Sequence, residues 1–136
     1  TVHVIKQQFQ VPSLSERHVL GLPDRQQALI REVLLCGAGQ PWVFARSIIP
    51  LTTLSGRLRK LRQLDNQPLG ALLFKDPSMT REAVEVACVN DNNNQLPCRS
   101  LVDESPVWGR RSVFRLDKKP LLVAEFFLPS FKPESR

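Results

Sequence analysis

The chain has 136 residues, 42% hydrophobic and 24% charged, with 19 lysine and arginine residues against 13 aspartate and glutamate. This length and composition indicate one globular domain with its own core, and they exclude a disordered chain. The apolar runs are too short for a bilayer, which needs about 20 residues, and the mixed N-terminus does not resemble a signal peptide. The formal charge of +6 leaves a polyanion, an anionic membrane or a small anionic ligand as possible partners.

The first third of the chain is predicted to form a strand and a hairpin. Residues 1–11 alternate loosely and are rich in Val, Ile and Phe, which favours a strand. The Pro, Ser and Gly residues in 12–23 predict a surface loop. Two apolar runs, 27–36 and 41–49, are joined by the Gly-containing segment 37–40, and this arrangement predicts a hairpin.

The middle of the chain is predicted to be mainly helical. Leucines recur at helical spacing through 51–64, while basic residues occupy the outer positions. A second helix is predicted over 68–74, which begins with a proline that suits the first helical position. Residues 76–78 interrupt the pattern, and the alternation of apolar residues with glutamates in 81–89 then predicts a strand.

The last third is predicted to contain a long loop and a second hairpin. Residues 90–106 hold four asparagines, two prolines and few large apolar side chains, which indicates a loop or insertion. The strand-like runs 107–116 and 120–128 flank a short charged turn, and a frayed tail follows from 129. Because strands and helices do not alternate regularly, the whole chain is predicted to be one α+β domain. Its single antiparallel sheet would have the helices packed on one face.

The cysteines do not form the pattern of a metal site or a disulfide framework. There is no CxxC, and His3 and His18 lie far from any cysteine, so we expect no bound metal. Cys36 is expected to be a small buried apolar residue. Cys88 and Cys98 flank the Asn-rich loop and would pair only in an oxidising setting, whereas a reducing cytoplasm is the predicted location.

Charged residues within apolar strands are the most informative feature of the sequence. Glu125 lies in the most apolar segment of the chain, where a carboxylate must be paired or neutral. Arg31 shares a strand face with Leu29 and Val33, and Arg46 shares one with aromatic residues. If these faces point inward, they enclose a pocket for an anionic, partly apolar ligand. The alternatives are a structural ion pair between Glu125 and Arg31, or arginines on a solvated face.

The remaining basic residues admit simpler interpretations. The cluster at 57–62 could follow a phosphate backbone, but it also fits the solvent face of an amphipathic helix. No aromatic residues are interleaved with it, which disfavours a nucleic-acid partner. Arg110 and Arg111 could likewise form a solvated hairpin rim. The sequence contains no GxSxG, GxxxxGK[ST] or GxGxxG motif.

Several blocks of the sequence form a recognisable set. They are IREVLLC at 30–36, QPWVFARSIIP at 40–50, TLSG at 53–56, PLG at 68–70, LF at 73–74, WGRRS at 108–112, KPLL at 119–122 and EFFLP at 125–129. In this order, and over nearly the whole chain, they closely resemble bacterial chorismate pyruvate-lyase. The resemblance implies an enzyme of ubiquinone biosynthesis that removes pyruvate from chorismate and leaves 4-hydroxybenzoate, without a metal or organic cofactor. It also implies an antiparallel sheet with helices against one side and a cavity closed by flaps.

The resemblance assigns roles to particular residues. Arg31 would hold the ring carboxylate, Leu69 would contribute a backbone contact, and Glu125 would meet the 4-oxygen of the ring. Arg46 would serve the enolpyruvyl carboxylate, so Glu125 and Arg46 are the candidate catalytic residues. We hypothesise that Glu125 is kept protonated by its apolar strand and donates a proton or hydrogen bond to the ether oxygen.

The chain also departs from the family pattern. A helical segment before the first strand supplies a methionine to the ligand site in the family, whereas this chain begins inside that strand and its only methionine is Met79. We therefore expect an N-terminally short domain spanning 1–136, monomeric and without stable membrane insertion, in which the loop 90–106 is unusually long. The alternatives are an effector-binding domain like those of winged-helix regulators, or an inactive relative that binds 4-hydroxybenzoate. The blocks at 53–56 and 108–112 favour the lyase.

Overall fold

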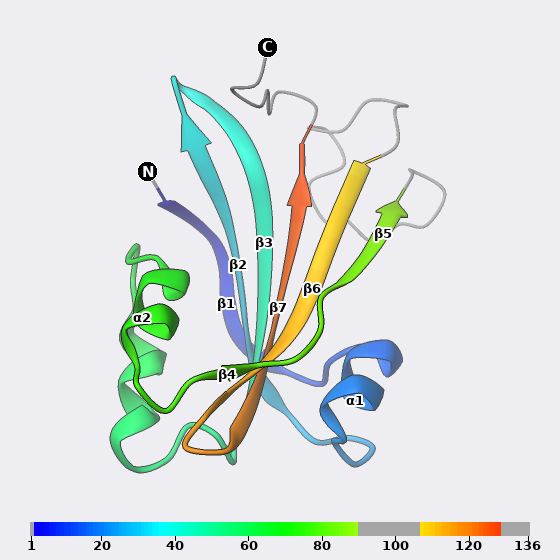
Figure 1. The fold of residues 1–136 in the computed structure, drawn as a ribbon, viewed down its shortest axis with the longest axis vertical. Coiled ribbons are helices and arrows are strands. Elements are labelled where there is room, and N and C mark those ends of the chain that lie inside the picture. The colour runs from blue at the N-terminus through cyan, green and yellow to red at the C-terminus, as the bar shows by residue number, and fades with distance from the viewer. Residues whose placement is uncertain (1, 90–106, 129–136) are drawn as a thin grey trace.

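Seven strands form one antiparallel sheet in the computed structural model, which describes residues 2–89 and 107–128 (Figure 1). The elements are β1 (Val2–Gln10), α1 (Leu14–Leu20), β2 (Ala28–Gly37), β3 (Gln40–Pro50), the 3-10 helix η1 (Gly56–Gln63), α2 (Leu69–Lys75), β4 (Thr80–Arg81), β5 (Glu85–Val89), β6 (Val107–Leu116) and β7 (Lys119–Phe127). The strand order is β1-β2-β3-β7-β6-β4, and β5 also pairs with β6. The predicted α+β class with a single antiparallel sheet is confirmed.

The β2–β3 hairpin forms at the predicted Gly-containing turn. Gly37 pairs with Gln40, and the two residues between them, Ala38 and Gly39, have φ values of 54° and 76°. Positive φ at both central positions is the conformation that matches the twist of the flanking strands. The second predicted hairpin, β6–β7, turns in the same way through Asp117 and Lys118. These turns help to set the register of the four central strands, which carry the site described below.

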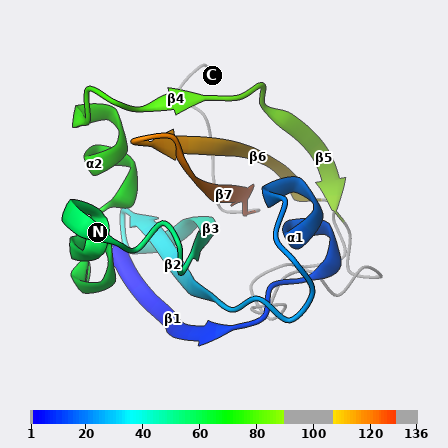
Figure 2. The same cartoon turned by 90° about the horizontal axis from the view of Figure 1, so that it is seen from below.

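Two apolar clusters cover opposite faces of the central strands. On one face, leucines of η1 and α2 pack against the strand residues Leu29, Ile49, Phe114, Leu116 and Leu121. On the other face, Leu20 of α1 packs against Ala28, Ile30, Ile48, Val113 and Leu122. Figures 1 and 2 show α1 and α2 on different sides of the sheet. The expectation that all helices share one face is therefore wrong for α1.

Helix α1 occupies a segment that was expected to be a loop. Ser13 caps the helix by accepting a hydrogen bond from the backbone N–H of Glu16, whose side chain accepts one from the Ser13 N–H in return. Gly21 ends the helix at φ 69°, in the left-handed region. This capping box and the terminal glycine are visible in the sequence as Ser13, Glu16 and Gly21, so the expectation of a loop gave too much weight to the flanking prolines.

Other boundaries differ more modestly from the expectations. The segment expected to be one helix over 51–64 is a turn followed by η1. The strand expected over 81–89 is divided into β4 and β5 by three residues outside any strand. Cys36 is partly exposed rather than buried. The loop 90–106, which contains Cys98, and the tail from 129 lie outside the described residues. No helix in the described ranges is long and apolar enough to cross a membrane.

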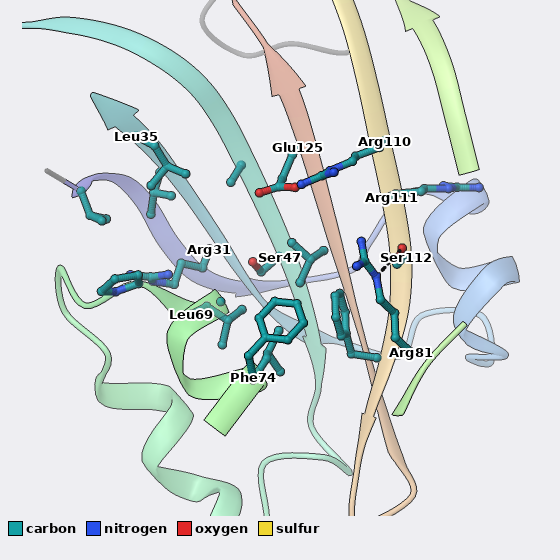
Figure 3. A pocket seen from close by; sticks show the side chains of 18 residues that line it. Arg31, Leu35, Ser47, Leu69, Phe74, Arg81, Arg110, Arg111, Ser112 and Glu125 are labelled. Carbon is teal, nitrogen blue, oxygen red and sulfur yellow. Dashed lines mark hydrogen bonds and ion pairs between the residues drawn. The ribbon is translucent and has the colours of Figure 1, made fainter. Parts of the chain in front are cut away.

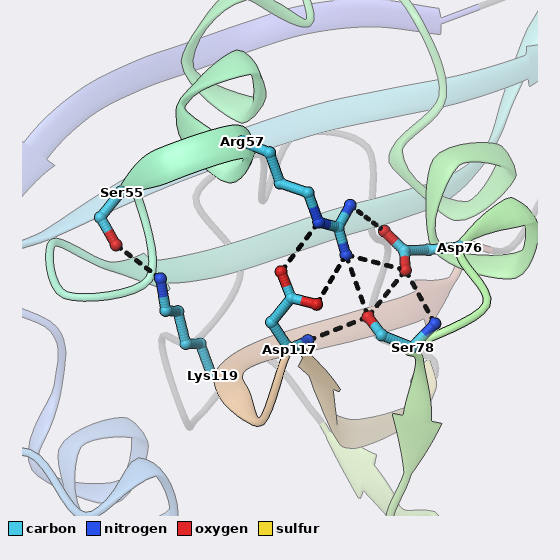
Figure 4. Close-up of polar contacts among 6 residues, drawn as sticks. All are labelled: Ser55, Arg57, Asp76, Ser78, Asp117 and Lys119. Carbon is cyan, nitrogen blue, oxygen red and sulfur yellow. Dashed lines mark hydrogen bonds and ion pairs between the residues drawn. The ribbon is translucent and has the colours of Figure 1, made fainter.

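An ion cluster around Arg57 joins three segments at one end of the sheet (Figure 4). The Arg57 guanidinium lies 2.7 Å from the Asp76 carboxylate at the end of α2 and 2.8 Å from the Asp117 carboxylate in the β6–β7 turn. Ser78 donates its hydroxyl hydrogen to Asp76 and accepts one from the Asp117 backbone N–H. The hydrogen bonds from Arg57 lower the pKa of both aspartates. This cluster fixes the end of α2, the helix that borders the cavity described below.

The capping box predicts the effect of a conservative change in α1. Replacing Ser13 by Ala removes the side-chain acceptor, and we expect it to lower the free energy of unfolding by about 1 kcal/mol. Ser13→Thr retains the hydroxyl and serves as the control, with a smaller loss. Urea unfolding followed by circular dichroism measures both variants. Equal stabilities of Ser13→Ala and the unmodified chain would show that the cap does not stabilise the fold.

Candidate functional site

A cavity of about 200 Å³ lies between the central strands and the first turns of α2 (Figure 3). Its apolar lining includes Val33, Leu35, Ala45, Leu69, Leu73, Phe74, Phe114 and Val123. Its polar lining consists of Arg31, Ser47, Arg81, Arg110, Arg111, Ser112 and Glu125. An apolar cavity with a few convergent polar side chains is the usual form of a small-molecule site.

Arg31 is a buried cation at the cavity wall. Only 2% of the residue is exposed, and its Nη2 atom donates hydrogen bonds to the backbone carbonyls of Asp65 (2.9 Å) and Gln67 (2.8 Å), just before α2. Its buried Nε atom has no hydrogen-bond partner among the described residues. Burial lowers the pKa of this guanidinium.

The partners of Arg31 leave its charge uncompensated. No carboxylate of the described residues lies within ion-pair distance of this guanidinium, and its carbonyl partners are neutral. A buried charge of this kind is unfavourable unless an opposite charge joins it. The geometry therefore fits a site that receives an anion.

Glu125 lies in the same cavity and is paired with a charged residue. Its Oε1 atom is 2.8 Å from Nε of Arg110 on the neighbouring strand, and its side chain is 28% exposed. The Arg110 guanidinium also lies over the ring of Phe127, 5.6 Å from the centroid. The surroundings of Glu125 are therefore not purely apolar, because its face of β7 borders the cavity and the Arg110 guanidinium.

Arg46 is on the opposite face of the sheet and does not line the cavity. In the register of the hairpin, Arg31 pairs with Ser47 while Glu32 pairs with Arg46, so the two arginines point in opposite directions. Arg46 forms ion pairs with Glu16 of α1 (2.7 Å) and with the buried carboxylate of Glu32. The structure therefore places Arg46 away from the cavity that Arg31 lines, contrary to the expectation that both face one pocket.

The Arg46 cluster instead holds α1 on the sheet. Burial alone would lower the pKa of Arg46, but its contacts with Glu16 and Glu32 outweigh this effect and raise it. Burial likewise favours a higher pKa for Glu16, but Arg46 and the cap of Ser13 bring it below the ordinary value. Both shifts favour the charged forms, so the cluster acts as an electrostatic clamp between helix and strands.

Leu69 lines the cavity, as the family resemblance led us to expect. It begins α2 directly after Pro68, is 5% exposed and belongs to the apolar cluster beneath the helix. Of the predicted site residues, Arg31, Leu69 and Glu125 therefore come together, and Arg46 does not.

Sequence reasoning did not identify Arg81, and it interpreted Arg110 as a solvated rim. Arg110 alternates with Ser112 and Phe114 on one face of β6, and Phe114 is part of the core. This alternation was a usable signal that Arg110 faces inward. Arg81 has no comparable signal, because β4 has only two residues and pairs with β6 through a contact distant in sequence.

Comparison with known proteins identifies close sequence relatives. The family model described as chorismate lyase matches residues 1–134. The probable chorismate pyruvate-lyase of Methylococcus capsulatus is 42% identical over 130 residues, covering 95% of this chain and 80% of that protein. The probable chorismate pyruvate-lyase of Marinobacter nauticus is 41% identical over 128 residues, covering 94% of this chain. The chain spans only 63% of the length of the Marinobacter relative.

Solved structures show where else this fold occurs. The PhnF C-terminal domain superposes with a TM-score of 0.76 at 12% identity, covering 96% of this chain and 84% of that one. The C-terminal domain of the histidine utilization repressor from Pseudomonas syringae gives a TM-score of 0.69 at 16% identity. The superposition covers 100% of this chain and 96% of that one. At these identities the likeness concerns the fold alone.

The electrostatic clamp predicts a pH-dependent effect of one substitution. Because the pKa of Glu16 is lower in the folded chain than the ordinary 4.5, ionised Glu16 stabilises the fold above pH 4.5. This contribution is lost as the pH falls through the lower, folded-state pKa. Glu16→Gln removes the charge but keeps a side chain that can complete the capping box. We expect it to lower the free energy of unfolding by about 1–3 kcal/mol at pH 7, and by progressively less below pH 4.5.

Urea unfolding at several pH values between 3 and 7 measures this difference. Glu82→Gln is the control, because Glu82 forms an exposed ion pair with Arg115 and its loss should change stability by less than about 1 kcal/mol. A Glu16→Gln effect that stays constant across the pH range would contradict the clamp.

Proposed function

The chain belongs to the chorismate lyase family, and we propose that it acts as a chorismate pyruvate-lyase in ubiquinone biosynthesis. The observation that carries the proposal is the cavity in which the uncompensated guanidinium of Arg31 shares an apolar chamber with Glu125. This chamber suits a substrate that carries a carboxylate on a carbon ring. The relatives that are about 40% identical carry the same activity in their names.

Each proposed contact has a counterpart in the described side chains. The ring carboxylate of chorismate would pair with Arg31, whose position is already fixed by two backbone carbonyls. Leu69 would offer a backbone contact, and the apolar lining of β2, β7 and α2 would surround the ring. A pre-positioned guanidinium fixes orientation because it can form two parallel hydrogen bonds to a carboxylate.

The reaction itself needs little beyond positioning and charge. The bond between the ring carbon and the enolpyruvyl oxygen breaks, and its electron pair leaves with that oxygen. A proton leaves the neighbouring ring carbon, which carries the hydroxyl, and the ring becomes aromatic as 4-hydroxybenzoate. The departing enolate of pyruvate takes up one proton at carbon and becomes pyruvate, which balances the proton lost from the ring. Aromatisation provides the driving force, and fixed charges lower the barrier.

We assign Glu125 the role of accepting that proton. If Glu125 meets the 4-oxygen, its carboxylate also lies beside the ring carbon that loses the proton. The Arg110 guanidinium lies 2.8 Å from this carboxylate, so a cation stands beside the group that would accept the proton. Arg110 then provides a cation near the position where the departing oxygen becomes negative. This assignment replaces the hypothesis that Glu125 acts as a neutral acid.

A non-catalytic ligand-binding domain is the less favoured alternative. Solved domains of this fold include the C-terminal domain of a repressor, but they share only the fold with this chain. We further propose that the chain works on small molecules as a cytoplasmic monomer without a nucleic-acid partner.

A direct assay tests the proposed function. Purified protein incubated with chorismate should release pyruvate and 4-hydroxybenzoate in equal amounts, followed by lactate dehydrogenase with NADH and by chromatography. Arg31→Gln should weaken 4-hydroxybenzoate binding about ten- to hundredfold, because it removes a charge-assisted pair. Arg31→Lys keeps the charge, and Arg59→Gln is a control on the exposed face of η1. The absence of pyruvate release from a folded protein that binds 4-hydroxybenzoate would leave only a binding domain.

The role of Glu125 makes a separate prediction. Glu125→Gln has the same shape but cannot accept the proton, and we expect kcat to fall by about a hundredfold or more. The KM for chorismate should change much less, because Arg31 still orients the ring. Steady-state kinetics at pH 7 measure both quantities. An unchanged kcat would exclude Glu125 as the proton acceptor.

A further inference from the structure

The arginines of the cavity differ in whether their charge is compensated. Arg110 is paired with Glu125 at 2.8 Å, and Arg111 is paired with Glu85 at 2.7 Å. Arg31 has only neutral carbonyl partners. The remaining arginine of the lining, Arg81, has no carboxylate within ion-pair distance among the described residues. Among the described residues, two guanidiniums of the cavity lining therefore have no carboxylate partner: that of Arg31, which is buried, and that of Arg81, which is exposed.

Arg81 is held in place by neutral groups. Its Nε atom lies 3.3 Å from Oγ of Ser112, a hydroxyl of a residue that is only 4% exposed. Its guanidinium lies over the ring of Phe114, 5.1 Å from the centroid, and Phe114 is its partner in the β4–β6 pairing. These contacts involve one edge and one face of the guanidinium. The terminal nitrogens make no hydrogen bond to any other described residue and remain available to an anion.

The two uncompensated arginines lie on opposite sides of an apolar space. In Figure 3, Arg31 and Arg81 are on either side of Leu69 and Phe74. Arg31 belongs to β2 and Arg81 to β4, and in the sheet β3, β7 and β6 lie between those strands. A ligand that satisfies both arginines has two anionic groups separated by an apolar body.

We propose that Arg81 binds the second carboxylate of the substrate, on the enolpyruvyl group, and thereby distinguishes substrate from ring product. The proposal rests on the proposed function, in which chorismate carries two carboxylates and 4-hydroxybenzoate carries one. It gives Arg81 the role that the sequence led us to expect for Arg46. After the carbon–oxygen bond breaks, Arg31 retains the ring product while Arg81 retains the carboxylate of pyruvate.

The decisive measurement compares the two ligands. Arg81→Gln should raise the KM for chorismate, and lower kcat/KM, by about ten- to hundredfold, because it removes one charge-assisted pair. The dissociation constant of 4-hydroxybenzoate, measured by calorimetry, should change by less than twofold. Arg81→Lys keeps the charge and should recover part of the loss. Arg115→Gln is the control, because Arg115 lies on β6 opposite Thr80, the neighbour of Arg81 in β4, but outside the cavity lining.

Other outcomes contradict the proposal in distinct ways. If Arg81→Gln weakens chorismate and 4-hydroxybenzoate equally, Arg81 shapes the ring site and does not bind a second carboxylate. If neither ligand is affected, Arg81 has no part in binding. Arg81→Gln could instead lower the thermal stability while leaving the KM for chorismate unchanged, with Arg81→Lys as stable as the unmodified chain. That result would show that the stacking of Arg81 on Phe114 has only a structural role.

The subsite can be tested even if the proposed function fails. Calorimetry of chorismate binding in the Glu125→Gln background, with and without Arg81→Gln, measures the second carboxylate site without turnover. If chorismate binding depends on Arg81 but the unmodified chain releases no pyruvate, the proposed second carboxylate site is supported and the proposed lyase activity is rejected. If chorismate binding in that background does not depend on Arg81 while the unmodified chain releases pyruvate, the lyase activity is supported and the second carboxylate site at Arg81 is rejected.

Discussion

The guanidinium of Arg31 sets the main constraint on this fold. It is almost wholly buried, and it is held by the carbonyls of Asp65 and Gln67 in the connection that leads into α2. These hydrogen bonds link β2 to the start of the helix that carries Leu69 and Leu73, so the same charge that awaits an anion also fixes the cavity wall. Because carbonyls offer only partial charges, an anionic group beside this guanidinium would compensate its charge more fully. Stability and ligand recognition therefore depend on the same side chain.

Strand alternation separates the charged residues of the hairpin into two systems. Arg31 and Ser47 share the cavity face, whereas Glu32 and Arg46, one position away on each strand, share the face under α1. On the α1 face the charges are compensated within the chain, and they attach a helix. On the cavity face two guanidiniums have no carboxylate partner among the described residues, and they suit an anionic ligand. Two arginines of one hairpin can thus serve different purposes, because successive side chains of a strand point to opposite faces of the sheet.

The sequence allowed the strands, both hairpins and the positions of Arg31, Leu69 and Glu125 to be predicted, since these depend on local pattern and on the family resemblance. It did not reveal that helices cover both faces of the sheet, and this is why Arg46 was assigned to the wrong side. Periodicity shows which residues share a face, but only packing shows what each face contacts. Arg81 was missed for a related reason, because its position depends on the pairing of β4 with β6 across a long sequence separation. Helix α1, in contrast, could have been predicted from its capping box.

The charges of the cavity also bear on the order of events in a lyase. In the proposed site, a substrate with two carboxylates would compensate both Arg31 and Arg81, whereas each product would compensate only one of them. Cleavage therefore does not separate either carboxylate from its arginine, but it removes the covalent link that held both charges in one molecule. Each product then binds through a single ion pair, without the advantage that linkage gives to two contacts made together. In the proposed lyase, substrate would be favoured over either product by the spacing of the guanidiniums on β2 and β4, which the strand order of the sheet sets.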